Sequence, residues 1–129
     1  MVRLIGMEKI KLVLWVKLIY KLMDKFLQTT HLSEILENSY KEPIVIFKYS
    51  SECGSSSVLA SELRKNIIEQ KLIHPVYLVT VQTHIALSEK ISDLFQIKHE
   101  SPQIIILNKG KVTYTAHHRE IDIRNFIFQ

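Results

Sequence analysis

The chain has 129 residues and a formal net charge of +4, and 47% of its residues are hydrophobic while 23% are charged. These values predict one globular domain with a core of its own. The single cysteine, Cys53, excludes an internal disulfide and a cysteine-rich zinc site, and it fits a reducing cytoplasm. Because the charge is modest and its lysines are scattered, we expect no nucleic-acid partner.

Residues 1–25 differ in composition from the rest and are rich in Lys, Leu, Ile and Val. The longest uncharged stretch within residues 1–25 is Leu12–Val16, which is too short to span a bilayer, and Lys17 interrupts any signal-peptide core. A basic helix on a membrane surface is conceivable, but its apolar positions form no single stripe. We therefore expect an N-terminal extension without a membrane role, followed by one domain over 26–129.

Strands and helices alternate through that domain. Phe26–Gln28 predicts a short strand, and Thr30 is a candidate cap for a helix with apolar residues at 32, 35 and 36. The apolar run "IVIFKY" (44–49) predicts a central strand that is covered on both faces. A helix to about Gln70 follows, with Ser55–Ser57 as caps and its apolar positions at Val58, Leu59, Leu63, Ile67 and Ile68.

The second half of the domain predicts three more strands. "VYLVTV" (76–81) precedes a helix with apolar residues Leu87, Ile91, Leu94 and Phe95. "QIIIL" (103–107) and "VTYTA" (112–116) form a hairpin around Asn108–Lys111, in which the Asn and the Gly suit a tight turn. A short last helix contains Ile121, Ile123, Phe126 and Ile127. This order predicts an α/β fold with a mixed central sheet flanked by helices, as in the thioredoxin fold.

The sequence "SSECGSSS" (50–57) places Cys53 directly between a central strand and a helix. Backbone N–H groups and the helix dipole at that position favour the thiolate, and they can lower a cysteine pKa from about 8.5 toward neutrality. Lys48 and the hydroxyls of Ser55 and Ser56 are further candidates to stabilise the thiolate, whereas Glu52 would oppose it. The direction of the net pKa shift stays open. A buried structural cysteine is the alternative, but such a residue more often lies within an apolar run.

Ser101-Pro102 precedes the strand at 103–107. In a thioredoxin-like sheet this loop lies against the reactive thiol, and we expect the Ser101-Pro102 bond to be cis.

The segments "IFKYSSECGSS" (46–56), "HESPQ" (99–103) and "GKVTYTAHHREI" (110–121) resemble the monothiol bacilliredoxin-like proteins of the bacillithiol system, which are also described as general stress proteins. The resemblance covers about 26–128. It implies Cys53 as the nucleophile and Ser56 at the position of a resolving cysteine in dithiol relatives. Tyr49, Glu52 and Ser55 depart from the family's usual His, Arg and Ile.

The resemblance implies a thiol-disulfide exchange protein that removes bacillithiol from S-bacillithiolated proteins through a mixed disulfide on Cys53. Its partners would be a low-molecular-weight thiol and S-thiolated client proteins, and it would need no metal or other cofactor. We expect Ser101, Pro102, His99 and His118 to contribute to substrate binding. A histidine near Cys53 would donate a proton to the leaving thiol or act as a cationic neighbour. For His118 we favour a surface histidine instead, whereas for His99 the functional and the surface interpretations are equally balanced.

Two other functions stay open. Cys53-Gly54-Ser55-Ser56 is similar to the Cys-Gly-Phe-Ser motif of monothiol glutaredoxins that carry a 2Fe-2S cluster, although Ser55 replaces the Phe. Alternatively, the chain is a non-catalytic thioredoxin-like binding module whose thiol Glu52 has inactivated.

Overall fold

The computed structural model describes residues 2–23 and 25–126, and it describes side chains for 8–21 and 25–126. A five-stranded mixed sheet lies at the centre, with the spatial order β1-β3-β2-β4-β5. Its strands are β1 (Phe26–Leu27), β2 (Ile44–Tyr49), β3 (Val76–Thr80), β4 (Gln103–Asn108) and β5 (Lys111–His117). The β1, β3 and β2 strands are parallel to one another. β4 pairs antiparallel with β2, and β5 pairs antiparallel with β4, so the predicted mixed sheet is confirmed.

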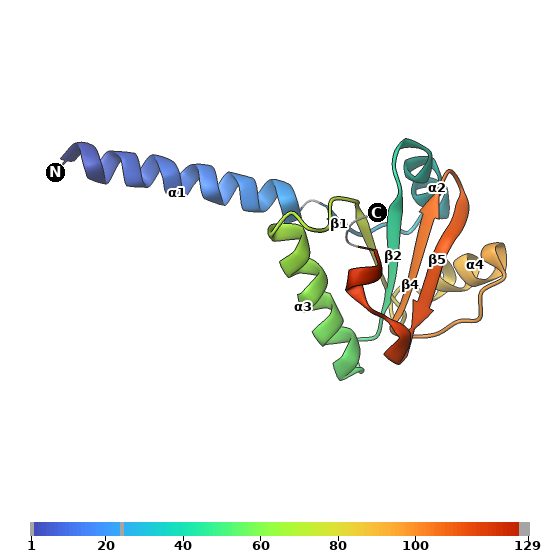
Figure 1. Cartoon of the computed structure of the whole chain (residues 1–129). Coiled ribbons are helices and arrows are strands. Elements are labelled where there is room, and N and C mark those ends of the chain that lie inside the picture. Colours follow the sequence, from blue (N-terminus) through green and yellow to red (C-terminus); the bar gives the residue numbers. More distant parts are fainter. Residues whose placement is uncertain (1, 24, 127–129) are drawn as a thin grey trace.

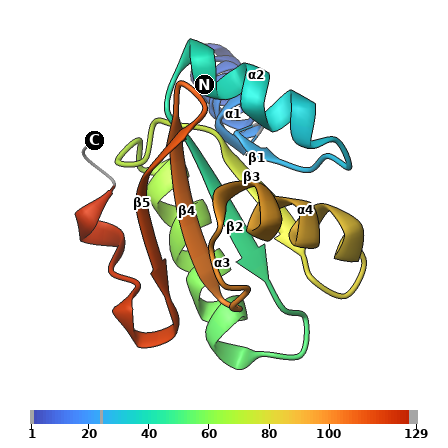
Figure 2. The same cartoon turned by 90° about the vertical axis from the view of Figure 1, so that its right-hand side faces the viewer.

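Helices cover both faces of this sheet (Figure 2). α3 (Gly54–Ile68) lies on one face, while α2 (Leu32–Lys41) and α4 (Ile85–Phe95) lie on the other. The remaining α-helix, α1 (Val2–Met23), projects away from the sheet and meets α3 near the C-terminal end of both helices (Figure 1). Within 2–23 and 25–126, no helix combines the length and the apolar character needed to cross a membrane.

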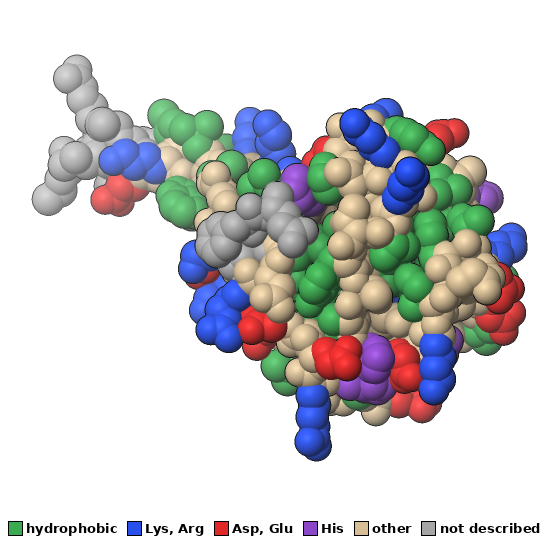
Figure 3. All heavy atoms as spheres, turned by 45° about the vertical axis from the view of Figure 1, so that its right-hand side comes forward, with side chains coloured by type: hydrophobic (Ala, Val, Ile, Leu, Met, Phe, Trp, Pro, Cys, Tyr) green, Lys and Arg blue, Asp and Glu red, His purple; other side chains and the backbone are tan. Residues whose placement is uncertain are grey.

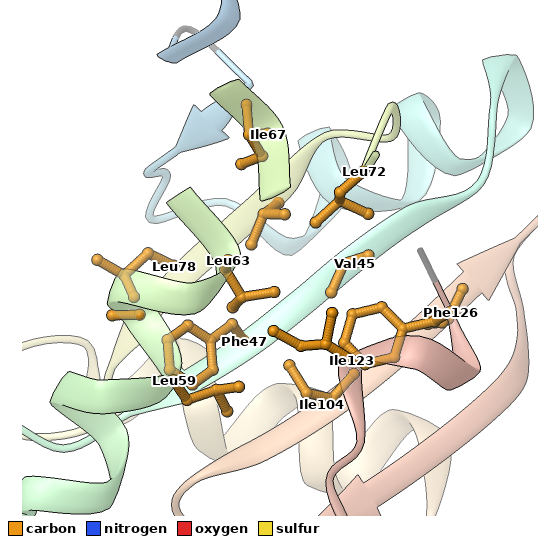
Figure 4. Packing of buried hydrophobic residues seen from close by; sticks show 13 residues of the cluster. Val45, Phe47, Leu59, Leu63, Ile67, Leu72, Leu78, Ile104, Ile123 and Phe126 are labelled. Carbon is orange, nitrogen blue, oxygen red and sulfur yellow. The ribbon is translucent and has the colours of Figure 1, made fainter. Parts of the chain in front are cut away.

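β2 is the central strand, and its alternate residues enter two different hydrophobic clusters. Val45 and Phe47 pack with the stripe Leu59, Leu63 and Ile67 of α3 (Figure 4). Ile44 and Ile46 point the other way, toward α2 and α4. Because successive strand residues point to opposite faces, Lys48 belongs to the α2 and α4 face.

Several local predictions are wrong in detail. Val58 and Leu94 were expected on the buried faces of α3 and α4, but both are exposed. The buried face of α3 contains Leu59, and that of α4 contains Leu87. The N-terminal cap of α2 is His31 and not Thr30, and that of α3 is Cys53 and not one of the serines that follow it.

The β4-β5 hairpin forms around Asn108–Lys111, as predicted, with Lys109 and Gly110 as its two turn residues. Lys109 and Gly110 have φ values of 53° and 75°, so the left-handed positions fall one residue later than Asn108. In a two-residue hairpin turn of type I′ both central residues have positive φ, and a Cβ on Gly110 would lie 2.7 Å from the Tyr40 hydroxyl.

The predicted last helix is instead two 3-10 turns, η1 (His118–Glu120) and η2 (Ile123–Asn125). Ile123 and Phe126 are nevertheless buried in the cluster beneath α3. Ile127, which the sequence also placed in that helix, lies outside the described residues.

Candidate functional site

Cys53 lies at the N-terminal end of α3, as its position after β2 predicts. The chain leaves β2 at Tyr49 and turns, with the Cys53 N–H donating to the Ser50 carbonyl at 3.2 Å. Cys53 is the N-cap residue, with extended backbone at φ −110° and ψ 118°, and its carbonyl accepts a hydrogen bond from the Ser57 N–H. The residue is partly exposed, and a Cβ on the adjacent Gly54 would contact nothing within 4 Å. The thiol therefore stands in a place that a reacting partner can reach.

Hydrogen bonds at the start of α3 lower the pKa of Cys53. The largest cause is the backbone N–H of Ser56, and the Ser55 N–H and both serine hydroxyls act in the same direction. Partial burial opposes them but does not outweigh them. The two backbone donors are unpaired N–H groups of the kind that every helix N-terminus presents, so the local fold itself favours the thiolate. Glu52 is exposed and is not among the groups that shift this pKa.

Gln82, which the sequence analysis missed, holds the loop before Cys53. Its Nε2 donates to the Ser50 hydroxyl at 2.7 Å, and its Oε1 accepts from the Ser51 N–H at 3.2 Å. The Ser50 N–H in turn donates to the Ser56 hydroxyl at 3.2 Å. Gln82 follows β3, and β2 and β3 are parallel, so both strands end at the same edge of the sheet. That shared edge is the sequence signal that could have identified Gln82.

A groove of about 320 Å³ runs beside the start of α3. It is lined by Ser55, Val58, Leu59, Glu62, Pro102, His118 and Ile121. Ser55 links the groove to the thiol, because the same residue donates hydrogen bonds to Cys53. The Ser101-Pro102 bond is cis, as predicted, and the buried Pro102 also lines the groove. An extended segment bound in this groove would therefore pass close to the thiol.

His118 lines this groove and is exposed, so its position at the surface, which the sequence favours, does not separate it from the candidate site. Its N–H donates to the Pro102 carbonyl at 3.0 Å, and its Nε2 lies 2.8 Å from a carboxylate oxygen of Glu100. The hydrogen bond with His118 is the main reason that the pKa of Glu100 is lowered. The ring thus joins the end of β5 to the loop that contains the cis bond.

Lys48 and His99 lie on the other face of the sheet. The Lys48 ammonium donates to the Ser88 carbonyl at 3.0 Å and to the Ser92 hydroxyl at 2.7 Å, and it lies 3.3 Å from the His99 ring. Burial lowers the pKa of Lys48 to about 8, and burial together with the Lys48 charge lowers the pKa of His99. The structure gives no contact for the expected support of the thiolate by Lys48, since its ammonium is bonded to α4 and Lys48 is not among the groups that shift the Cys53 pKa.

Ser101 completes the predicted set. Its hydroxyl is buried and makes no hydrogen bond to any residue that the structure describes. Across 2–23 and 25–126, no three His, Cys, Asp or Glu side chains gather closely enough to hold a metal ion. The structure thus brings Cys53, Ser55, Ser56, Pro102 and His118 together and separates Lys48 and His99 from them.

Comparison with known proteins gives both a family and a fold. A family model described as monothiol bacilliredoxin BrxC matches residues 25–126. The match begins just after α1 and includes every element of the sheet, the thiol and the groove.

Solved structures with related folds agree with the predicted thioredoxin-like architecture. A protein described as having a thioredoxin fold superposes with a TM-score of 0.69 at 20% identity, covering 80% of this chain and 91% of its own. Oxidised thioredoxin from Plasmodium falciparum gives 0.61 at 13% identity, with 79% and 94% covered. Mitochondrial thioredoxin 3 from Saccharomyces cerevisiae gives 0.56 at 17% identity, with 70% and 81% covered. The fold is therefore thioredoxin-like.

Proposed function

Because the chain belongs to the monothiol bacilliredoxin BrxC family, we propose that it removes bacillithiol from proteins that carry this small thiol as a mixed disulfide. Family and fold together support a thiol-disulfide redox role. The removal of bacillithiol is the more specific part of the proposal, and it also rests on the geometry around the single cysteine.

One observation carries the proposal. Cys53 is partly exposed at the N-terminus of α3, where the N–H groups of Ser55 and Ser56 lower its pKa. The thiolate is the nucleophile in thiol-disulfide exchange, and its leaving-group ability in the reverse step also improves as the pKa falls. A cysteine with these two properties is suited to form and then release a mixed disulfide.

In the first step, the Cys53 thiolate attacks the bacillithiol sulfur of a client protein's mixed disulfide. The bond between Cys53 and bacillithiol forms while the bond to the client breaks, and the client cysteine leaves as a thiolate that takes a proton from water. In the second step, another bacillithiol thiolate attacks the sulfur of bacillithiol on Cys53. Oxidised bacillithiol disulfide leaves, and Cys53 returns to the thiolate.

The second step needs an external thiol because no other cysteine is present in the chain. Ser56, three residues after Cys53, is fully buried, and its hydroxyl hydrogen-bonds to the thiol and to the Ser50 N–H. A hydroxyl cannot form a disulfide, so the adduct on Cys53 persists until a small thiol arrives. In this proposal bacillithiol is a co-substrate and no resident cofactor takes part.

The partners that we propose are bacillithiol and S-bacillithiolated client proteins, which would bind along the groove between Ser55 and Pro102. In the groove, Glu62 and His118, which is paired with Glu100, would contact polar groups of the client. Leu59 and Ile121 would contact its apolar groups. We propose a cytoplasmic setting, where protein thiols are kept reduced and an exchange cycle can turn over.

The test is the release of bacillithiol from a bacillithiolated model protein, with the wild-type chain compared with Cys53→Ser. We expect release by the wild type, none above background by the variant, and a bacillithiol adduct on Cys53 by mass spectrometry. Ser57→Ala is the matched control, because Ser57 is exposed in the same turn and does not hydrogen-bond to the thiol. Absence of release by the folded wild-type chain would leave a non-catalytic binding module as the better explanation.

A further inference from the structure

α1 exposes large apolar side chains along its described length. Eight of them are exposed, with Trp15 at 59% and Leu12 at 64% of their possible surface. The eight are Ile10, Leu12, Val13, Leu14, Trp15, Val16, Leu18 and Tyr20. The rest of the molecule does not cover them, because α1 projects away from the sheet (Figure 1). Contiguous apolar surface of this kind indicates an interaction site.

The charges on the same helix are almost all positive. Between residues 8 and 21, Lys9, Lys11, Lys17 and Lys21 are opposed by Glu8 alone. Figure 3 shows lysines and hydrophobic side chains side by side on the projecting helix. At about 100° per residue, Lys9, Lys17 and Lys21 fall within an arc of about 120°, and Leu12, Trp15 and Ile19 fall on the side opposite its centre. The other apolar residues lie all around the helix, and Lys11 lies beside Trp15. A long lysine side chain can also lay its methylenes along apolar surface while its ammonium stays in water.

A second copy of the chain fits this helix poorly. Pairing two α1 helices would bring their lysines together, and each helix offers only Glu8 to neutralise them. An anionic bilayer surface provides both an apolar layer and negative charge. Trp15 and Tyr20, each with an apolar ring and a polar tip, are the side chains that favour the boundary between these two layers.

The sequence alone favours an extension without a membrane role, but because these apolar side chains are exposed, we propose that α1 binds the surface of an anionic lipid bilayer and lies in the plane of the interface. The helix then acts as a membrane anchor for the redox domain without crossing the bilayer. Cys53 stays accessible in this arrangement, because α1 meets the C-terminal end of α3 whereas Cys53 is at its N-terminal end (Figure 1). About 22 Å of helix separates the two ends.

The experiment uses the full chain with vesicles of phosphatidylcholine alone or of phosphatidylcholine mixed with phosphatidylglycerol. Trp15 is the only tryptophan, so its fluorescence reports on α1 directly. We expect flotation with the anionic vesicles, a blue shift of Trp15 emission, at least about tenfold weaker binding to the neutral vesicles, and weakening by added salt.

Two variants with the same change in net charge separate the helix from charge alone. In the first, Lys9, Lys11, Lys17 and Lys21 are changed to Glu, and we expect at least about tenfold weaker binding to the anionic vesicles. In the matched control, the exposed Lys41, Lys90, Lys109 and Lys111 of the domain are changed to Glu, and binding is expected to persist. Circular dichroism and the iodoacetamide reactivity of Cys53 verify that both variants are folded.

Three results would overturn the proposal. One is failure of the wild-type chain to bind the anionic vesicles, and another is an equal loss of binding by both charge variants. The third is a dimer in sedimentation whose Trp15 emission is already blue-shifted without vesicles, since a second copy would then cover the helix. None of these results bears on exchange at Cys53, which is measured separately.

Discussion

Cys53 and Lys48 are only five positions apart in the sequence, but they lie in opposite environments on different sides of the sheet. Cys53 is partly exposed among hydrogen-bond donors that favour its charged form. Lys48 is fully buried beneath α4, where burial disfavours its charged form and lowers its pKa to about 8. Strand alternation and the turn at Ser50–Cys53 produce this separation. Proximity in sequence is therefore a poor guide to which groups tune a reactive thiol.

The largest effect on the thiol is expected for Ser56→Ala. This change removes a hydroxyl that hydrogen-bonds to Cys53 and that accepts from the Ser50 N–H, and bonds to a charged group are among the stronger ones. We expect the rate of alkylation of Cys53 by iodoacetamide at about pH 7 to fall by roughly fivefold. Ser57→Ala is the control in the same turn. Equal rates for the two variants would show that the serine hydroxyls do not stabilise the thiolate.

The two histidines provide the next comparison, because His118 lies in the groove and His99 on the opposite face. His118→Ala removes the main hydrogen-bond partner of the Glu100 carboxylate and leaves only the more distant Lys98, so the carboxylate would repel the client thiolate that leaves more strongly. We expect exchange with a bacillithiolated protein to slow by about threefold to fivefold, and His99→Ala to have little effect. Kinetics of both variants with the same client check this, and a larger loss for His99→Ala would reverse the assignment.

A smaller effect is expected for Gln82→Ala, since Gln82 reaches Cys53 only through the Ser50–Ser51 loop. Loss of its two hydrogen bonds should let that loop relax and lower the alkylation rate of Cys53 by about twofold. Gln28→Ala, at an exposed position outside the site, is the matched control. If Gln82→Ala were alkylated as fast as Gln28→Ala, this positioning role would be wrong.

Lys48→Met should have the smallest effect on Cys53 and a distinct effect on stability. Because the pKa of Lys48 is lowered from 10.5 to about 8, the unfolded chain binds more protons between these two values. The wild-type free energy of unfolding should therefore rise with pH across that window relative to the variant, by up to about 3 kcal/mol.

Urea unfolding at several pH values measures this difference, with the exposed Lys90→Met as the control. Alkylation of Cys53 in Lys48→Met should match the wild type. Slower alkylation of Cys53 in Lys48→Met would show that Lys48 does support the thiolate.

The fold could largely be predicted from sequence because its strands are strong local signals. The apolar run at 44–49 identifies a strand covered on both faces, and β2 is indeed central. The last segment was harder, because Ile123 and Phe126 are buried as expected but only 3-10 turns present them. Two apolar residues four or fewer positions apart fit either conformation, so spacing alone does not distinguish them.

The site could be predicted in part. Cys53 follows from its place between strand and helix, and the pairing of Ser55 and Ser56 with it is local. Gln82 and His118 reach the site from elsewhere in the chain, so only the strand order places them there. The direction of the Cys53 pKa shift also required the structure, because it depends on where Lys48 and Glu52 point.

The pKa of Cys53, measured from the pH dependence of its alkylation by iodoacetamide, tests the central claim most directly. With Cys53 at the N-terminus of α3 and hydrogen-bonded by Ser55 and Ser56, the pKa is expected to lie below the ordinary cysteine value of about 8.5. A pKa at or above about 8.5 would contradict the account, since the thiol would then lack the stabilised thiolate on which the exchange depends.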